Sequence, residues 1–244
     1  MKLSGIWGLI LSLVVFFNWA LIAQDPEKKE SETEFSFENV STGKLPAGWK
    51  IEATNPGKEL ADWQVVTDKT APSGQKVLSL LKTNNYGSTY NLCWTDKISF
   101  TDGEVEVKFK ANSGREDQGG GVIWRAQDRD NYYIARMNPL ENNFRIYFVK
   151  DAHRKMLASA RIEIPTGEWH ELEITHRGTE IAGYIDGKKL LELEDNTFPE
   201  AGGVGLWTKA DAATSFDEFE VEMKYEEHEE DEEHEHENNE THPE

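Results

Sequence analysis

Short alternating runs of apolar and polar residues, each closed by turn residues, fill the stretch 119–221. The same pattern stands upstream, where residues 103–110 place two valines and a phenylalanine on one side and charged side chains on the other. Alternation with period 2 is typical of a strand with one buried face. Asp186–Gly187 between two such runs predicts a two-residue hairpin, since both residues accept positive φ angles. With no helical stripe in any window, the chain is predicted to be all-β, an antiparallel β-sandwich.

Both ends of the chain differ in composition from its middle. Residues 1–23 combine Lys2, an apolar run and small Ala20 and Ala23, which indicates a signal peptide cleaved after Ala23, with Ala20 as the second choice. The alternative is an uncleaved anchor, because the apolar run approaches the ~20 residues that span a bilayer. We expect an exported chain, periplasmic or secreted, with no stable membrane insertion after cleavage. Residues 24–33 are predicted to be a flexible leader, 34–225 the sandwich and 226–244 a disordered acidic tail.

Charge narrows the range of partners. The formal net charge is −20, but 11 of the 46 acidic residues lie in 226–244, where there is no Lys or Arg. The rest carries 35 acidic against 26 basic residues, a mildly acidic balance that excludes nucleic acid as an expected partner. The four histidines of the tail predict at most weak binding of divalent metals, and the alternative is a solvated tail. Cys93 is the single cysteine, so no internal disulfide can form, and we expect it to be a buried apolar residue.

Four motifs carry a family resemblance. They are Phe37 with Leu45-Pro46, Gly48-Trp49 and Trp63; Gly121 to Arg125 with Asp130 to Tyr133 and Arg136; Gly167 to His170 with Asp186-Gly187; and Gly203 to Trp207 with Phe216 to Phe219. Together they resemble the concanavalin A-like lectin and glucanase superfamily, a jelly roll. Within it the chain is similar to exported 3-keto-disaccharide hydrolase-like domains, described as family 16 glycoside hydrolase-like, and more loosely to laminin G-like modules. The resemblance implies a function with sugars. Fold analogy alone does not transfer chemistry.

The carboxylates of a family 16 glucanase are missing. Such an enzyme carries Glu-x-Asp-x-x-Glu or Glu-x-Asp-x-Glu on one strand, and neither string occurs in the predicted sandwich, residues 34–225. The pairs Glu192/Glu194 and Glu171/Glu173 alternate with apolar residues, and we interpret both as solvated strand faces. Ordinary glucanase activity is therefore not expected.

A set of arginines and aromatic residues is the candidate carbohydrate site. It lies on three consecutive predicted strands and comprises Trp124, Arg125, Tyr132, Arg136 and Arg145, with Tyr133 and Tyr147 nearby. Aromatic faces stack on sugar C–H patches and arginines donate to hydroxyls. Alternation places Arg125 with Ile123, and Tyr132 and Arg136 with Ile134; packing in the core is the alternative role for the aromatic members.

Asp128 and Asp130 are candidate calcium ligands, although a hairpin turn uses the same residue types for backbone reasons. His153, His170 and His176 lack zinc-ligand spacing. Two main functions follow. The first is glycan binding without cleavage. The second is a sugar-active hydrolase or lyase of the 3-keto-disaccharide type, in which Arg125, Arg136 and a carboxylate or His170 polarise the sugar. A laminin G-like contact with protein is a third alternative.

Overall fold

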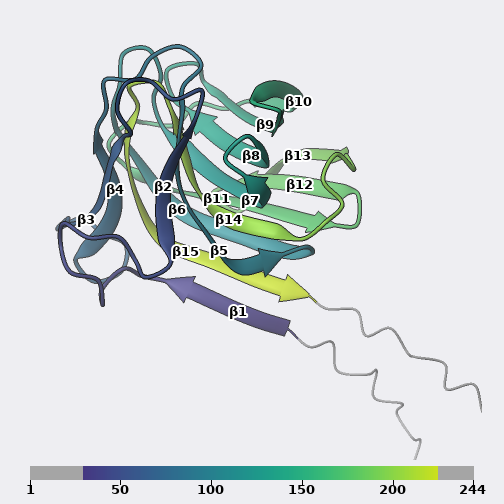
Figure 1. Ribbon diagram of the computed structural model, residues 1–244, viewed down its shortest axis with the longest axis horizontal. Coiled ribbons are helices and arrows are strands. Elements are labelled where there is room, and N and C mark those ends of the chain that lie inside the picture. Colours follow the sequence, from purple (N-terminus) through teal and green to yellow (C-terminus); the bar gives the residue numbers. More distant parts are fainter. Residues whose placement is uncertain (1–29, 225–244) are drawn as a thin grey trace, which may run out of the picture.

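The computed structural model describes residues 30–224 as two antiparallel sheets packed face to face (Figure 1). The predictions of a signal peptide and an acidic tail lie outside these residues. In spatial order the eight-stranded sheet comprises β13 (Lys188–Glu194), β12 (Glu180–Ile185), β11 (Trp169–Arg177), β6 (Gly103–Ser113), β15 (Ala213–Lys224), β4 (Lys76–Lys82) and β3 (Asp62–Thr67), with β1 (Glu30–Phe35) paired to β15. The seven-stranded sheet comprises β10 (His153–Arg161), β9 (Asn143–Lys150), β8 (Asn131–Asn138), β7 (Gly120–Asp128), β14 (Gly202–Lys209), β5 (Tyr90–Phe100) and β2 (Trp49–Thr54). None of the described residues forms a helix long and apolar enough to cross a bilayer.

The main core lies between the sheets and follows the predicted alternation. In β6, Val105, Val107 and Phe109 are fully buried, while Glu106 and Lys108 between them are half-buried on the outer side. Each such apolar side chain contributes roughly 1.5–3 kcal/mol by leaving water. The predicted all-β sandwich is therefore confirmed.

Two local predictions are also confirmed. Asp186 and Gly187 have φ angles of 50° and 70°, as a type I′ hairpin turn requires. Cys93 is a free, fully buried thiol in the core, and burial raises its pKa well above the usual range.

β1 corrects the predicted start of the domain. Glu30 to Phe35 pair antiparallel with β15, so the part of the predicted leader from Glu30 to Thr33 is a strand. The sequence ESETEF hides this, because it has no apolar residue before Phe35. The strand is held by backbone pairing and by Phe35, whose ring centroid lies 5.3 Å from that of Trp49.

The seven-stranded sheet curls over its outer face, the face turned away from the other sheet. β2 and β8 are separated by three strands, which in a flat sheet would leave about 19 Å between them. Yet the hydroxyl of Thr54 in β2 lies 2.7 Å from that of Tyr132 in β8.

The curled face encloses a second apolar cluster. Its members are Tyr90, Leu92, Trp94, Ile123, Ala126, Tyr132, Ile134, Tyr147, Val149 and Trp207. Arg154 of β10 covers the cluster, since its guanidinium carbon lies 4.4 Å from the Tyr147 ring centroid and 5.0 Å from that of Tyr90. Much of the outer face is therefore filled by its own side chains.

Candidate functional site

A polar cluster lies on the outer face of the seven-stranded sheet, beside the enclosed aromatic residues. Arg136 of β8 and Arg145 of β9 face each other directly across the strand pair. The carboxylate of Glu141, in the turn between these strands, accepts from Arg136 Nη2 at 2.8 Å and from Arg145 Nη1 at 3.2 Å. Tyr147 places its hydroxyl 3.1 Å from Arg136 Nη2 and 3.4 Å from Arg145 Nη1. We call Arg136, Glu141, Arg145 and Tyr147 the arginine cluster.

The arginine cluster is both ordered and accessible. Arg136 is buried and donates through Nη1 to Asn143 Oδ1 at 2.8 Å, while its Nε has no partner among the described residues. The side chains of Arg145 and Glu141 are 30% and 45% exposed. A ligand can therefore reach the two exposed members, while the buried Arg136 keeps the geometry fixed.

Electrostatics keep Glu141 ionised. Burial would raise the pKa of this carboxyl, but hydrogen bonds from Arg136 and Asn143 and the charges of the two arginines lower it below its ordinary value. Glu141 in turn offsets part of the positive charge. The cluster thus offers hydrogen-bond donors in a fixed arrangement without the charge of an unpaired arginine pair.

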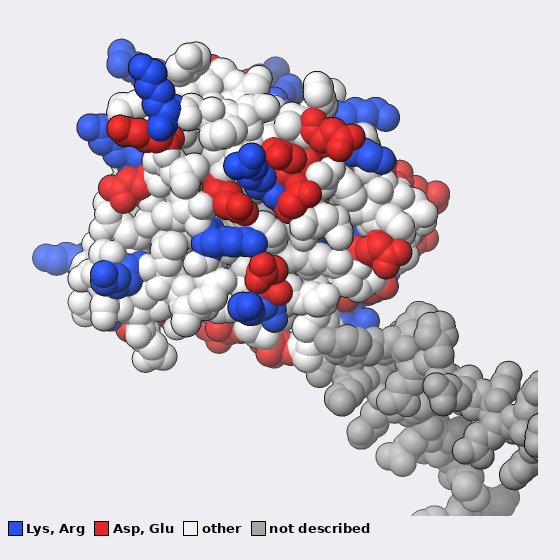
Figure 2. Space-filling model, viewed as in Figure 1, with Lys and Arg blue, Asp and Glu red and all other residues white. Residues whose placement is uncertain are grey.

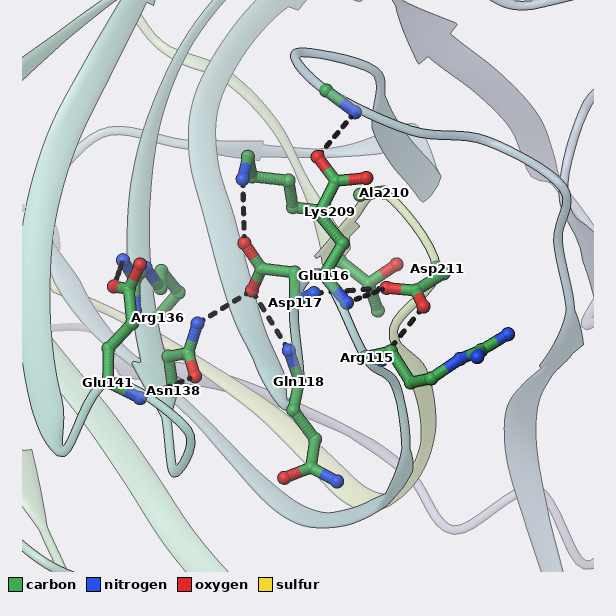
Figure 3. A network of polar contacts seen from close by, with 12 residues as sticks. Arg115, Glu116, Asp117, Gln118, Arg136, Asn138, Glu141, Lys209, Ala210 and Asp211 are labelled. Carbon is green, nitrogen blue, oxygen red and sulfur yellow. Dashed lines mark hydrogen bonds and ion pairs between the residues drawn. The ribbon is translucent and has the colours of Figure 1, made fainter.

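A polar network supports the cluster from the neighbouring loop (Figure 3). Asp117 accepts from Asn138 Nδ2 at 2.8 Å and from Lys209 Nζ at 2.8 Å, which ties the loop to β8 and β14. Asp211 accepts from the backbone N–H groups of residues 115–117 at 2.8–3.0 Å. These contacts hold the loop beside the end of β8 that carries Arg136.

Tyr132 lies on the same outer face but is enclosed. Its ring is fully buried in the second apolar cluster, and its hydroxyl contacts that of Thr54. Burial raises its pKa well above the usual range. Its position supports the packing alternative, because no sugar can reach the ring without opening the curled sheet.

Trp124 lies on the opposite face of the sheet, in the main core. It stacks on Tyr133 with ring centroids 5.3 Å apart, and its indole N–H donates to Nδ1 of His176 at 2.9 Å. Burial, together with the nearby charge of Arg125, lowers the pKa of His176 to about 3, so this histidine is neutral. The expected role of Trp124 in sugar binding is therefore replaced by a role in packing.

Arg125 does not share a face with Ile123, which corrects the expectation from alternation. Its φ is 45°, and the β7–β8 register shifts between Trp124 and Asp128, so a bulge turns the side chain. The buried guanidinium donates to the carbonyls of Thr101, Phe198 and Gly178 and to Asp102 Oδ1, at 2.8–3.2 Å. The donors of Arg125 therefore join turns at one end of the sandwich.

The alternative catalytic set does not converge either. His170 lies on β11 of the eight-stranded sheet, where its Nδ1 is 2.9 Å from Asp186 Oδ2. Arg136 lies on the outer face of the other sheet, and Arg125 at the end of the sandwich. These three residues therefore cannot act together on one sugar.

Asp128 and Asp130 lie in the β7–β8 turn. Asp128 Oδ1 accepts from the backbone N–H of Asp130 at 2.7 Å, and both its oxygens accept from Asn131 Nδ2 at 3.0 Å. Within residues 30–224, the carboxylates close enough to share one ion are Glu106, Glu171 and Glu173, on the eight-stranded sheet. The geometry favours the turn role of Asp128, and calcium binding stays a prediction.

The same turn borders a cleft of about 370 Å³ that also includes Trp94, Glu52 and Asp96. Trp94 donates to Glu52 Oε2 at 2.8 Å and lies beneath Lys50, whose Nζ is 3.9 Å from the ring centroid. Sequence reasoning passed over Trp94. Cys93 is expected to be buried, and side chains alternate along a strand, so its neighbour Trp94 could have been predicted on the outer face of the sheet.

Comparison with known proteins identifies the family. A family model described as the 3-keto-alpha-glucoside-1,2-lyase-like domain matches residues 48–222. The chain belongs to this family. The resemblance inferred from the four sequence motifs is thereby confirmed. A search of curated proteins finds no match.

Solved structures show the fold of this lyase-like domain. The carbohydrate-binding module CBM66 from Bacillus subtilis matches at 17% identity and a TM-score of 0.56, covering 72% of this chain and 95% of the module. A family GH16 protein from Bacteroides ovatus, in complex with a mixed-linkage glucan product, matches at 13% identity and a TM-score of 0.56. The match covers 78% of this chain and 99% of that protein. SCLam, a non-specific endo-beta-1,3(4)-glucanase of family GH16, matches at 12% identity and a TM-score of 0.57. The match covers 82% of this chain and 93% of the glucanase. These structural matches show a concanavalin A-like sandwich, and at such low sequence identity they show no particular activity.

Proposed function

We propose that this lyase-like domain binds a saccharide at the arginine cluster. The observation that carries the proposal is that one carboxylate, Glu141, holds two guanidinium groups side by side on the outer face of the sheet, with Arg145 open to solvent. Arginine N–H groups donate in fixed directions, which suits recognition of sugar oxygens. Asn143 and Tyr147 already hold Arg136 in place, so binding a ligand would cost little side-chain conformational entropy at this residue.

The family description suggests the class of sugar. In a 3-keto-α-glucoside the oxygen on C3 is a carbonyl, which accepts hydrogen bonds but cannot donate them. Arginine only donates. The donors of the arginine cluster would therefore suit the C3 carbonyl oxygen of such a sugar.

Charge supports a neutral ligand. Glu141 offsets part of the positive charge of Arg136 and Arg145. On the face drawn in Figure 2, basic and acidic side chains are interspersed and do not merge into a basic patch of the kind that binds phosphate backbones.

The test is calorimetric titration of the full chain with methyl 3-keto-α-glucoside and with methyl α-glucoside. Arg145→Ala is expected to weaken binding of the keto sugar by about tenfold or more, because hydrogen bonds from a charged donor are lost. Arg161→Ala is the matched control, since Arg161 lies on the adjacent strand β10 with 80% of its side chain exposed and pairs with Glu163. Equal affinity of wild type and Arg145→Ala, or no binding of either sugar, would overturn the proposal.

A second candidate function is elimination, favoured by the match to a 1,2-lyase-like family over residues 48–222. A ketone at C3 acidifies the C2 proton. A base would take that proton, and the electron pair would pass into a C3 enolate. Its return would restore the C3 carbonyl, form the C1–C2 double bond and break the C1–O bond, and the leaving oxygen would take a proton back from the protonated base to leave as an alcohol. Donors of the arginine cluster would stabilise the enolate oxygen.

Elimination requires a general base near the arginine cluster. Glu141 has a lowered pKa and is a poor proton acceptor. Within residues 30–224, the carboxylates with a raised pKa are Glu106, Glu173, Asp217 and Glu220, all on strands of the eight-stranded sheet. Binding without turnover is therefore the better supported function. Release of p-nitrophenol from p-nitrophenyl 3-keto-α-glucoside, abolished in Arg145→Ala but not in Arg161→Ala, would favour elimination instead.

A further inference from the structure

A cleft at one end of the sandwich lies outside the arginine cluster. It has a volume of about 760 Å³ and is formed by the loops 55–62 and 82–89. Tyr86 lines it with 77% of its surface exposed, the highest value among the exposed large hydrophobic side chains of residues 30–224. Leu60, on the opposite loop, is 52% exposed.

The loop that carries Tyr86 is held on both sides of this residue. Asn85 is buried and donates to Asn91 Oδ1 at 2.7 Å. The backbone N–H of Gly87 donates to Glu116 Oε1 at 2.8 Å, and the Ser88 carbonyl accepts from Asn55 Nδ2 at 3.3 Å. Glu116 belongs to the loop network of Figure 3. Tyr86 is thus presented to solvent by a fixed backbone.

The side chain of Tyr86 has no specific partner in the described part of the chain. Among residues 30–224 it makes no stacking contact, and its hydroxyl has no hydrogen-bond partner. A second cleft, of about 560 Å³, also includes Tyr86 and lies toward Leu81 and Arg115. An aromatic ring standing between two clefts is a platform on which a ring-shaped ligand can stack.

Polar groups and charge narrow the ligand class. In the larger cleft, Lys58 and Lys82 are balanced by Glu59 and Asp62, which gives no net charge. The lining on the loop of Tyr86 also includes hydroxyl and amide side chains, among them those of Thr83, Asn84 and Ser88. A neutral lining disfavours phosphates and polyanions, whereas donors and acceptors around an aromatic platform suit a sugar, which has hydroxyl edges and an apolar C–H face.

From these observations we infer that the cleft of Tyr86 is a second saccharide site, which takes a neutral oligosaccharide by stacking one pyranose ring on Tyr86. The site uses no residue of the arginine cluster. It does not require a keto group, because both donors and acceptors line it. An oligosaccharide would therefore bind here whether or not a keto sugar is bound at Arg145.

The test is backbone ¹H–¹⁵N spectroscopy of the full chain titrated with maltohexaose, cellohexaose and laminarihexaose. At least one hexasaccharide is expected to shift the amides of Asn84, Gly87 and Ser88. Tyr86→Ala should weaken that binding about tenfold, as truncating a central aromatic contact does, and Tyr86→Phe should retain it. Arg145→Ala should leave it unchanged.

Three results would overturn the inference. These are no shift of the loop amides with any of the three probes, unchanged affinity in Tyr86→Ala, or loss of the loop shifts in Arg145→Ala. Tyr86 is exposed, so its variants are expected to fold, and unchanged amide shifts in the strands would verify that they do.

Discussion

Replacing Glu106 with Gln is predicted to stabilise the domain above neutral pH. Glu106 lies in the middle of the outer face of the eight-stranded sheet, where it is directly opposite Glu173 on one side and Glu220 on the other. Like charges in direct cross-strand positions destabilise a sheet. Burial, followed by repulsion from Glu171, Glu220 and Glu173, raises the pKa of Glu106 from 4.5 to about 7.

The sign of the effect follows from linkage. Since the folded state raises the pKa of Glu106, the stabilising contribution of its bound proton is fully present below about pH 4.5 and is lost as pH rises through about 7. Each pKa unit corresponds to about 1.4 kcal/mol, so the difference sets a ceiling of about 3.4 kcal/mol. Glu106 is only half-buried and shares the repulsion with three carboxylates, which leaves about 1–2 kcal/mol after solvent screening.

The assay is urea unfolding followed by tryptophan fluorescence at pH 8.5 and pH 4.5. Glu106→Gln should exceed wild type by about 1–2 kcal/mol in the free energy of unfolding at pH 8.5 and match it at pH 4.5. Glu192→Gln is the control on the same sheet, with a side chain 74% exposed, and should change little at either pH. A gain of equal size at both pH values, or no gain at pH 8.5, would refute the reasoning.

Two further predictions concern the buried polar groups at the end of the sandwich. Burial and the charge of Arg125 lower the pKa of His176 from 6.5 to about 3 in the folded state. As pH falls below about 6.5, this histidine is protonated in the unfolded chain but stays neutral in the folded one, so the free energy of unfolding decreases. His176→Asn, whose Oδ1 can still accept from Trp124, should remove about 2 kcal/mol of the destabilisation seen between pH 7 and pH 5 in urea titrations; an unchanged pH slope would contradict this. Arg125→Ala should lower the free energy of unfolding by about 3–5 kcal/mol, because Asp102 and three carbonyls lose a buried partner. A loss below 1 kcal/mol, as expected for the exposed Arg161→Ala, would show that these contacts are not structural.

Local periodicity was sufficient to predict the sandwich and part of the site. Arg136 and Arg145 were predicted on neighbouring strands, and the structure pairs them directly because alternation is unbroken in β8 and β9. The same rule fails for Arg125, where one residue with a left-handed φ turns the side chain away from the face of Ile123. A bulge leaves no signal in apolar alternation, so the sequence alone could not reveal it.

The remaining parts of the site depend on long-range structure. Glu141 is the exception, because it lies in the turn between β8 and β9, within five residues of both arginines, and this local hairpin brings its carboxylate to both. Tyr132 is enclosed because the sheet curls until β2 reaches β8, which depends on the twist of seven strands and on no local motif. Tyr86 gave no periodic signal, because its position is set by the hydrogen bonds of its neighbours, from Asn85 to Asn91 and from Gly87 to Glu116.

The central claim, that the arginine cluster holds a saccharide, is tested most directly by side-chain ¹H–¹⁵N spectra of arginine-labelled protein. On addition of methyl 3-keto-α-glucoside, the Nε–H signals of Arg136 and Arg145 are predicted to shift together. Those of Arg161 and Arg177, on β10 and β11, should not move. Saturable binding with both cluster signals unmoved, or no binding at all, would contradict the account.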